Sequence, residues 1–173
     1  MRIRFLLILT LLAGCDGPYK DLEQKYPKVN ETSAENLKPE SLGVTSQRHK
    51  GAFSFREMNN VQLTGNAVFI SLNSYFHSSI EIPISNITGC SCTYFNKDNW
   101  DTDLILGEDG IEIGIHLSKA TKDWCFESNL PVITGKQQRD WLYNRKPLPS
   151  FENYVQVKRE EFDYQFKQAC MGY

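Results

Sequence analysis

Apolar and polar residues alternate in four stretches of this chain between residues 51 and 117. A period of two residues is typical of a β-strand that buries one of its faces. The apolar positions are Phe53 and Phe55; Val61 and Leu63; Ile80, Ile82 and Ile84; and Ile111, Ile113, Ile115 and Leu117. Turn-forming residues recur about every ten positions, which favours a small antiparallel sandwich or barrel over strand–helix–strand units.

Two further signals refine these strands. Asp109-Gly110 separates the apolar segment 104–106 from the last alternating stretch, and this dipeptide is a strong signal for a tight hairpin. Pro83 has no backbone N–H to donate, so we expect its strand to lie at a sheet edge or a bulge.

The last segment of the chain changes to a helical period. Its apolar residues lie at i, i+4, i+7, i+8 and i+11: Phe162, Phe166, Ala169, Cys170 and Tyr173. This spacing predicts an amphipathic C-terminal helix that covers an open end or face of the sheet. The fold prediction is therefore a β-rich α+β body, a small antiparallel sandwich or barrel of about seven strands with a C-terminal helix. In strand order this arrangement resembles the pleckstrin-homology-type barrel.

The first fourteen residues have the composition of an export signal. Arg2 and Arg4 precede an apolar stretch at residues 5–12. That length suits the core of a secretory signal and is too short for the ~20 residues of a membrane-spanning helix. We therefore predict a signal peptide over residues 1–14.

Leu12, Ala13, Gly14 and Cys15 follow this stretch and resemble the lipobox of bacterial lipoproteins. The resemblance implies that the lipoprotein signal peptidase recognises the first three residues, and that Cys15 becomes a diacylated N-terminus, also acylated on its amine, for example by palmitate. Two or three such chains anchor a protein stably. Asp16 resembles the signal that retains enterobacterial lipoproteins in the inner membrane. This resemblance favours the periplasmic side of the inner membrane over the outer membrane. The alternative is an ordinary secreted protein with a cysteine near its cleavage site.

The next segment, residues 15–50, is polar and contains three prolines. We predict that it is a lipidated tether and that residues 51–173 form a single globular domain. As a flexible coil the tether would reach roughly 30 to 35 Å from the bilayer. Within it, Pro18 and apolar residues at i, i+3 and i+7 allow one short helix: Tyr19, Leu22 and Tyr26.

Four cysteines follow Cys15: Cys90, Cys92, Cys125 and Cys170. An even number in an exported protein predicts disulfides. A bond between Cys90 and Cys92 on one strand is at the limit of disulfide geometry, so we expect both to pair with Cys125 and Cys170, in either order. The alternatives are a four-thiolate zinc site, which the spacing disfavours, and a redox couple of Cys90 and Cys92, which lacks a nearby cationic residue. We expect neither a metal nor a cofactor.

The densest acidic run comprises Asp98, Asp101, Asp103, Glu108 and Asp109. It lacks the glycine and glutamate positions of a calcium-binding loop, so we interpret it as a solvated loop beside the hairpin. His116 lies on the polar phase of its strand, and we expect it to be exposed.

Residues 136–146 combine basic and aromatic side chains. Arg139, Trp141, Tyr143 and Arg145 are candidate docking residues, because Trp, Tyr and Arg dominate interface hot spots. The other interpretation is a short helix that packs Trp141 and Leu142 on the body and ends before Pro147.

Charge and motifs limit the possible functions. With 19 Lys and Arg against 21 Asp and Glu, the chain has no bulk positive charge for nucleic-acid binding. It has no nucleophile elbow, phosphate loop or dinucleotide fingerprint. We therefore expect a non-catalytic, lipid-anchored module that binds an envelope protein or a peptidoglycan-associated partner. The alternatives are a small-ligand or lipid-binding barrel with an apolar internal pocket, and a thiol-redox or hydrolytic enzyme.

Overall fold

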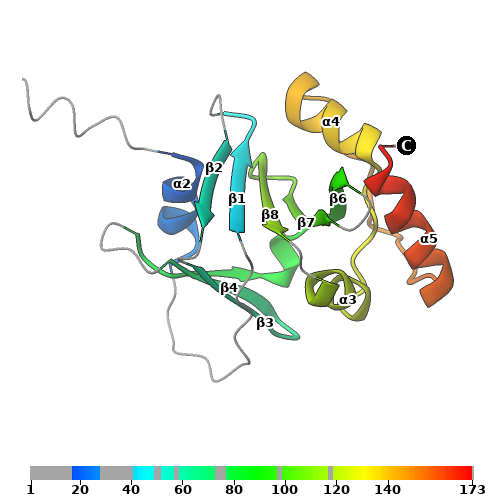
Figure 1. The fold of residues 1–173 in the computed structure, drawn as a ribbon, viewed down its shortest axis with the longest axis horizontal. Helices are drawn as coiled ribbons and strands as arrows, with labels where there is room; N and C mark the ends of the chain where they lie inside the picture. The colour runs from blue at the N-terminus through cyan, green and yellow to red at the C-terminus, as the bar shows by residue number, and fades with distance from the viewer. Residues whose placement is uncertain are drawn as a thin grey trace, which may run out of the picture.

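The computed structural model describes residues 17–27, 41–48, 52–56, 59–72, 77–96, 99–116 and 119–172. These ranges contain eight strands in two antiparallel sheets, four α-helices and one short 3-10 helix (Figure 1). The strands are β1 (Ser41–Ser46), β2 (Ala52–Arg56), β3 (Asn59–Leu63), β4 (Ala67–Leu72), β5 (Ile80–Pro83), β6 (Gly89–Asn96), β7 (Asn99–Leu106) and β8 (Ile111–His116). The helices are α2 (Pro18–Lys25), α3 (Lys119–Glu127), α4 (Gly135–Asn144), α5 (Arg159–Cys170) and the 3-10 helix η1 (Ile84–Asn86).

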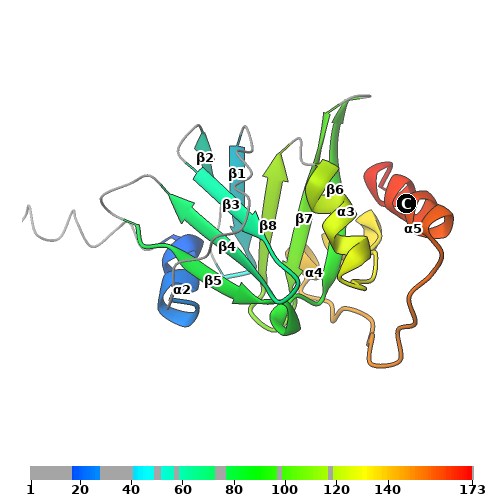
Figure 2. The same cartoon turned by 90° about the horizontal axis from the view of Figure 1, so that it is seen from below.

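The strand order is β2-β1-β8-β7-β6 in one sheet and β3-β4-β5 in the other. Figure 2 shows the three-stranded sheet lying across one face of the five-stranded sheet. Alternate side chains fill the space between the sheets, and many are fully buried, among them Val44, Ile70, Ile82, Leu104 and Ile113. The predicted antiparallel α+β class is confirmed, and the described strands form two sheets that do not close into a barrel.

Several local predictions are confirmed. β7 and β8 form the expected hairpin, with Gly110 at a φ of 64° in its turn, a conformation that glycine adopts readily. Pro83 is exposed and ends β5, an edge strand. The C-terminal helix is α5, which buries Phe162, Phe166 and Ala169 in the main core.

The predicted domain boundary at residue 51 is wrong, because two elements of the expected tether belong to the folded body. β1 lies inside the five-stranded sheet, between β2 and β8. The helix opened by Pro18 is present as α2, and its Tyr19 and Leu22 are buried in the main core. Tyr26, directly after α2, donates a hydrogen bond to Asp109 in the β7–β8 turn. A flexible tether over the whole of residues 15–50 is therefore not what this sequence forms.

The signal peptide, the lipobox and Asp16 lie outside the described residues, as do Leu117 and Tyr173. Of the helices in the described part of the chain, none has the length and apolar character needed to cross a bilayer.

Candidate functional site

Two disulfides join β6 to helices α3 and α5. Cys90 is bonded to Cys125 of α3, and Cys92 is bonded to Cys170 of α5, with Cα atoms 6.4 and 4.6 Å apart, respectively. Cys90 and Cys92 point to the same face of β6 because they are two residues apart on a strand. The prediction that this strand is tied to both Cys125 and Cys170 is confirmed, and the structure resolves the order of pairing.

Helix α4 lies on the face of the five-stranded sheet opposite the main core (Figure 1). It begins with a capping box, in which the Gln137 N–H donates to the Thr134 hydroxyl at 3.2 Å and the Thr134 N–H donates to the Gln137 side chain at 2.9 Å. Trp141 is only 3% exposed and packs in a second, smaller core with Ile105, Ile133 and Leu142. The packing interpretation is therefore right for Trp141, and the docking prediction is wrong for it.

The structure separates the other candidate docking residues. Arg139 and Tyr143 are exposed on α4, and Arg139 Nη2 donates to the carbonyl of Gly172, just after α5, at 3.0 Å. Arg145 is also exposed, but it donates to the Gln47 carbonyl at 3.3 Å and lines a different pocket, of about 540 Å³. Arg139 and Tyr143 therefore belong to one surface and Arg145 to another.

A buried polar network lies beneath α4. Gln138 Nε2 donates to Asp103 Oδ2 of β7 at 2.9 Å and to Glu112 Oε2 of β8 at 2.7 Å. The Ser91 hydroxyl is 2.7 Å from Gln138 Oε1, and the Thr93 hydroxyl donates to Asp103 Oδ2 at 2.8 Å. In the described part of the chain, every side-chain donor to these two carboxyl groups is uncharged.

Burial raises the proton affinity of this network. Asp103 is 2% exposed and Glu112 is 9% exposed. Burial raises the pKa of Asp103 well above its usual value, and repulsion from Glu112 adds to the rise, whereas hydrogen bonds from Thr93 and Gln138 oppose it. Burial also raises the pKa of Glu112, against the hydrogen bond from Gln138. The pair therefore holds protons at pH values where exposed carboxyl groups are ionised.

The interpretation of the acidic run as a solvated loop is wrong for Asp101 and Asp103. Both lie in β7, where they pair in register with His116 and Gly114 of β8. His116, which we expected to be exposed, is half-buried and hydrogen-bonded to Asp101. Burial raises the pKa of Asp101, and the contact with His116 opposes this rise. A Cβ atom at Gly114 would lie 3.0 Å from Asp103 Oδ1, so glycine leaves room for the buried carboxyl group.

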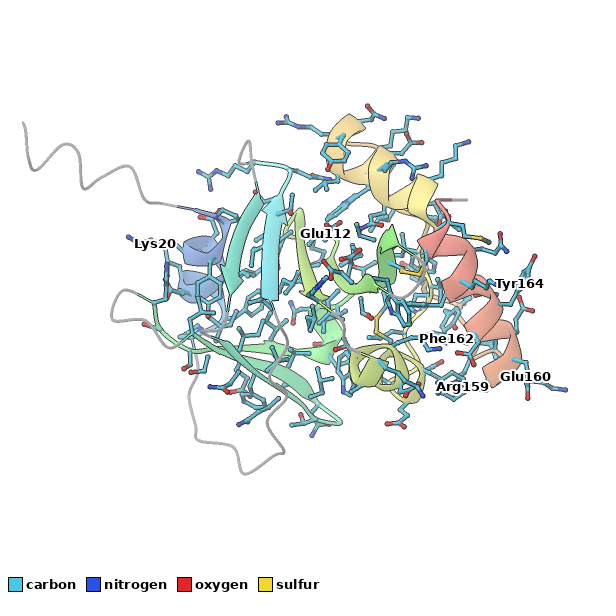
Figure 3. All side chains as sticks on the ribbon, in the orientation of Figure 1. Lys20, Glu112, Arg159, Glu160, Phe162 and Tyr164 are labelled. Carbon is cyan, nitrogen blue, oxygen red and sulfur yellow. A yellow bond between two sulfur atoms is a disulfide. The ribbon has the colours of Figure 1, made fainter. Side chains whose placement is uncertain are left out.

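A pocket of about 380 Å³ opens beside this network, between α4 and the C-terminal end of α5. Glu112, near the middle of the molecule in Figure 3, and Gln138 line it from the network. Arg139 and Tyr143 line it from α4, and Met171 lines it from the end of α5. Tyr143 and Met171 are 73% and 47% exposed, although both are large side chains with apolar surface. We call this site the α4–α5 pocket.

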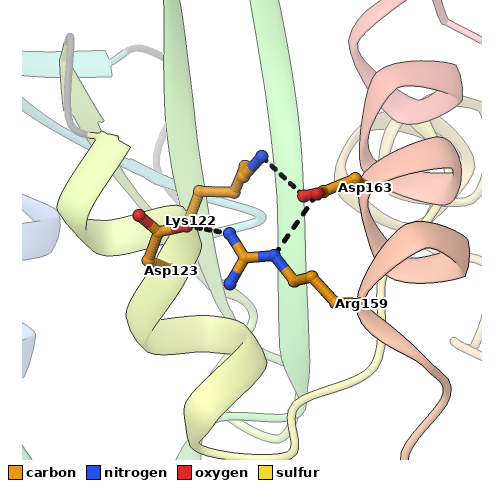
Figure 4. A network of polar contacts seen from close by, with 4 residues as sticks. All are labelled: Lys122, Asp123, Arg159 and Asp163. Atoms are coloured by element: carbon orange, nitrogen blue, oxygen red, sulfur yellow. Dashed lines mark hydrogen bonds and ion pairs between the residues drawn. The ribbon is translucent and has the colours of Figure 1, made fainter.

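A network of charged side chains fixes α5 on α3 (Figure 4). Lys122 Nζ of α3 lies 2.7 Å from Asp163 Oδ1 of α5, Arg159 Nε lies 3.3 Å from Asp163 Oδ2, and Arg159 also pairs with Asp123. Burial acts to raise the pKa of Asp163, but the hydrogen bonds from Lys122 and Arg159 outweigh it and lower that pKa. Together with the disulfide of Cys170, this network holds the helix whose end forms one wall of the pocket.

The sequence does not mark Asp103, Glu112 and Gln138 as a unit, because they come from three elements and the two acids occupy the polar phase of their strands. Carboxyl groups with raised pKa beside a pocket are typical of functional sites, and they can accept hydrogen bonds from a cationic group or exchange protons with a ligand. Within the described ranges, no group of three or more His, Cys, Asp and Glu side chains is arranged to hold a metal ion. No protein-family model matches the chain, and comparison with curated proteins finds no match.

Proposed function

We propose that this protein is a lipid-anchored, non-catalytic binding module on the periplasmic side of the bacterial inner membrane, and that it binds an envelope protein or a peptidoglycan-associated partner at the α4–α5 pocket. The signal-like residues 1–14, Cys15 and Asp16 motivate the anchor and its destination. One observation carries the binding role: Tyr143 and Met171 are exposed at the pocket beside Arg139. Tyr, Met and Arg are enriched at protein interfaces.

The position of the pocket supports this proposal. Cys15 and Gly17 are two residues apart, a separation that the backbone spans with at most about 7 Å. Because α2 begins at Pro18, a lipid on Cys15 would hold the α2 end of the body against the bilayer. Figures 1 and 2 both show α2 and α5 at opposite ends of the molecule. The pocket beside α5 would then face away from the membrane, towards soluble or cell-wall partners.

A photo-crosslinking amino acid tests the binding role in cells. Placed at Tyr143, it is expected to give a crosslinked product with an envelope component. Tyr164 is the matched control, because it is another exposed tyrosine, 59% exposed, on the outer side of α5 and outside the pocket (Figure 3). Identical products from both positions, or no product from either, would contradict the proposal.

Mass spectrometry of the protein isolated from membranes tests the anchor separately. We expect a mature N-terminus at Cys15 that carries acyl chains, and we expect Cys15→Ala to remain as an uncleaved, unacylated precursor. An unmodified Cys15 in the native protein would refute the anchor without bearing on the pocket.

A further inference from the structure

We propose that the α4–α5 pocket recognises a ligand that carries both an ammonium group and a carboxylate group, as an amino acid or a short peptide does. The ammonium group binds at Glu112 and the carboxylate binds Arg139. This inference deepens the proposed function, because it names the chemistry that the partner presents to the pocket.

Glu112 forms the acidic end of the pocket. Its side chain is about nine-tenths buried and lines the pocket. Its Oε2 accepts the hydrogen bond from Gln138, and within the described residues its other oxygen has no partner. Ionisation of a buried carboxyl group is costly without a cation, and an ammonium group that enters the pocket can pair with Glu112 as it ionises.

Arg139 forms the basic end. It is exposed, lines the same pocket, and uses Nη2 to donate to the Gly172 carbonyl. A guanidinium group has five N–H donors in a planar fork that suits a carboxylate, so donors remain for a ligand. Among the ion pairs of the described residues, none involves Arg139 or Glu112, so neither side chain is committed to a protein partner of opposite charge.

The size and walls of the pocket limit the ligand. A volume of about 380 Å³ lies at the small end of the range for small-molecule sites, which runs from ~300 to 1,000 Å³. Tyr143 and Met171 also line the pocket and offer apolar surface for a short aliphatic segment of the ligand. A dipeptide therefore suits the site better than a long extended chain.

Titration calorimetry of the full chain purified in detergent tests the inference with three probes: alanyl-alanine, its N-acetyl derivative, which lacks the ammonium group, and its C-terminal amide, which lacks the carboxylate. We expect the parent dipeptide to bind and each derivative to bind about tenfold or more weakly, since each loses a charge-assisted hydrogen bond. Equal affinity for the three probes, or no binding of the parent at millimolar concentration, would overturn the inference.

Two variants assign the ends of the ligand. Glu112→Gln is expected to weaken binding of the parent and to abolish its advantage over the N-acetyl derivative, while keeping its advantage over the amide. Arg139→Gln is also expected to weaken binding of the parent, but to abolish its advantage over the amide while keeping its advantage over the N-acetyl derivative. One matched control is Glu160→Gln on the outer side of α5 (Figure 3). The other is Lys136→Gln on α4; both residues are exposed and outside the pocket. Such crossed selectivity reports direct contact, because general damage to the fold would weaken all three probes alike.

Proton release gives a second readout. Asp101 and Asp103 of β7 and His116 of β8 lie on the same face of the sheet as Glu112, and Arg139 lines the pocket from α4. Burial holds the pKa of Glu112 above its usual value, so binding of an ammonium group beside it favours ionisation and releases protons. The binding enthalpy of the parent dipeptide is therefore expected to differ between phosphate and Tris buffers at one pH. Glu112→Gln should reduce that difference; an unchanged difference would contradict the role of Glu112.

The ligand chemistry could be presented by a free peptide or by the peptide part of peptidoglycan. Co-sedimentation with purified sacculi distinguishes the two sources. If the protein sediments with sacculi and an excess of alanyl-alanine prevents this, the ligand is the peptide part of peptidoglycan. If the dipeptide binds but Tyr143 crosslinks to nothing and sacculi retain no protein, the ligand inference stands and the envelope-binding function fails. If Tyr143 crosslinks but all three probes bind equally, the function stands and this inference fails.

Discussion

Removing the disulfide between Cys92 and Cys170 is expected to lower both the stability of the fold and the affinity of the α4–α5 pocket. These cysteines are 78 residues apart in sequence. The chain-entropy relation for a loop of that length gives a stabilisation of about 4.5 kcal/mol. Both cysteines also line the pocket, so their replacement by alanine releases the end of α5 that forms its wall.

The second disulfide provides the control. Cys90 and Cys125 are 35 residues apart, which corresponds to about 3.8 kcal/mol by the same relation. Neither of them lines the pocket. Cys90→Ala/Cys125→Ala is therefore expected to destabilise the protein nearly as much as Cys92→Ala/Cys170→Ala, but to leave ligand affinity almost unchanged under conditions where both variants are folded.

Urea unfolding followed by tryptophan fluorescence measures the stabilities. For a dependence of about 2 kcal/mol per molar urea, each double variant should shift the midpoint down by about 2 M. Calorimetry with alanyl-alanine measures the pocket. Equal loss of ligand affinity in both double variants would refute the assignment of the α5 end to the binding site, and an unchanged urea midpoint in both would refute the stability reasoning.

Three further outcomes are expected from urea unfolding. Leu22→Ala should cost about 2 to 5 kcal/mol, because Leu22 is fully buried, whereas a residue of a flexible tether would cost less than about 0.5 kcal/mol. Trp141→Ala should cost about 3 to 5 kcal/mol and Tyr143→Ala less than about 0.5 kcal/mol, and similar losses for both would contradict their assigned burial. Burial raises the pKa of Asp103 in the folded state. Its protonation therefore contributes fully to the free energy of unfolding below the pKa of the unfolded state, and this contribution is lost as the pH rises through the pKa of the folded state. The stability of Asp103→Asn relative to the unaltered protein should therefore increase from pH 5 to pH 8, and a constant difference would contradict the raised pKa.

The sequence predicted best the elements whose pattern is complete within a few residues. The alternating isoleucines of β5 and β8 and the spacing of Phe162 and Phe166 in α5 each define a buried face by themselves. β1 was missed because only Leu42 and Val44 mark its buried face and Gly43 lies between them. Its place in the sheet comes from pairing with β2 and β8. β8 is distant from β1 in sequence, and the local sequence of β1 does not indicate either pairing.

The candidate site was less predictable because burial at its position depends on tertiary packing. Asp103 and Ile105 occupy the same face of β7, but from the sequence Asp103 was interpreted as part of a solvated loop. Helix α4 covers both, with Gln138 over Asp103 and Trp141 over Ile105. The sequence of α4 allowed either packing or docking for Trp141, and only the position of Ile105 beneath it decides between them.

The polar network is not explained by stability alone. Ile105 shows that an apolar residue of β7 packs well under α4, yet Asp103, two residues earlier on the same face, is a buried carboxyl group without a cationic partner among the described residues. Replacing buried polar groups by apolar ones of similar volume is often neutral or stabilising, so the network costs free energy that a simple core would not. Gly135 adds a second constraint, since a Cβ there would lie 2.8 Å from the Ala169 carbonyl oxygen and push α4 away from α5. The buried carboxyl groups and the close contact of α4 with α5 both depart from the rules of core packing, and such departures are typical of functional sites.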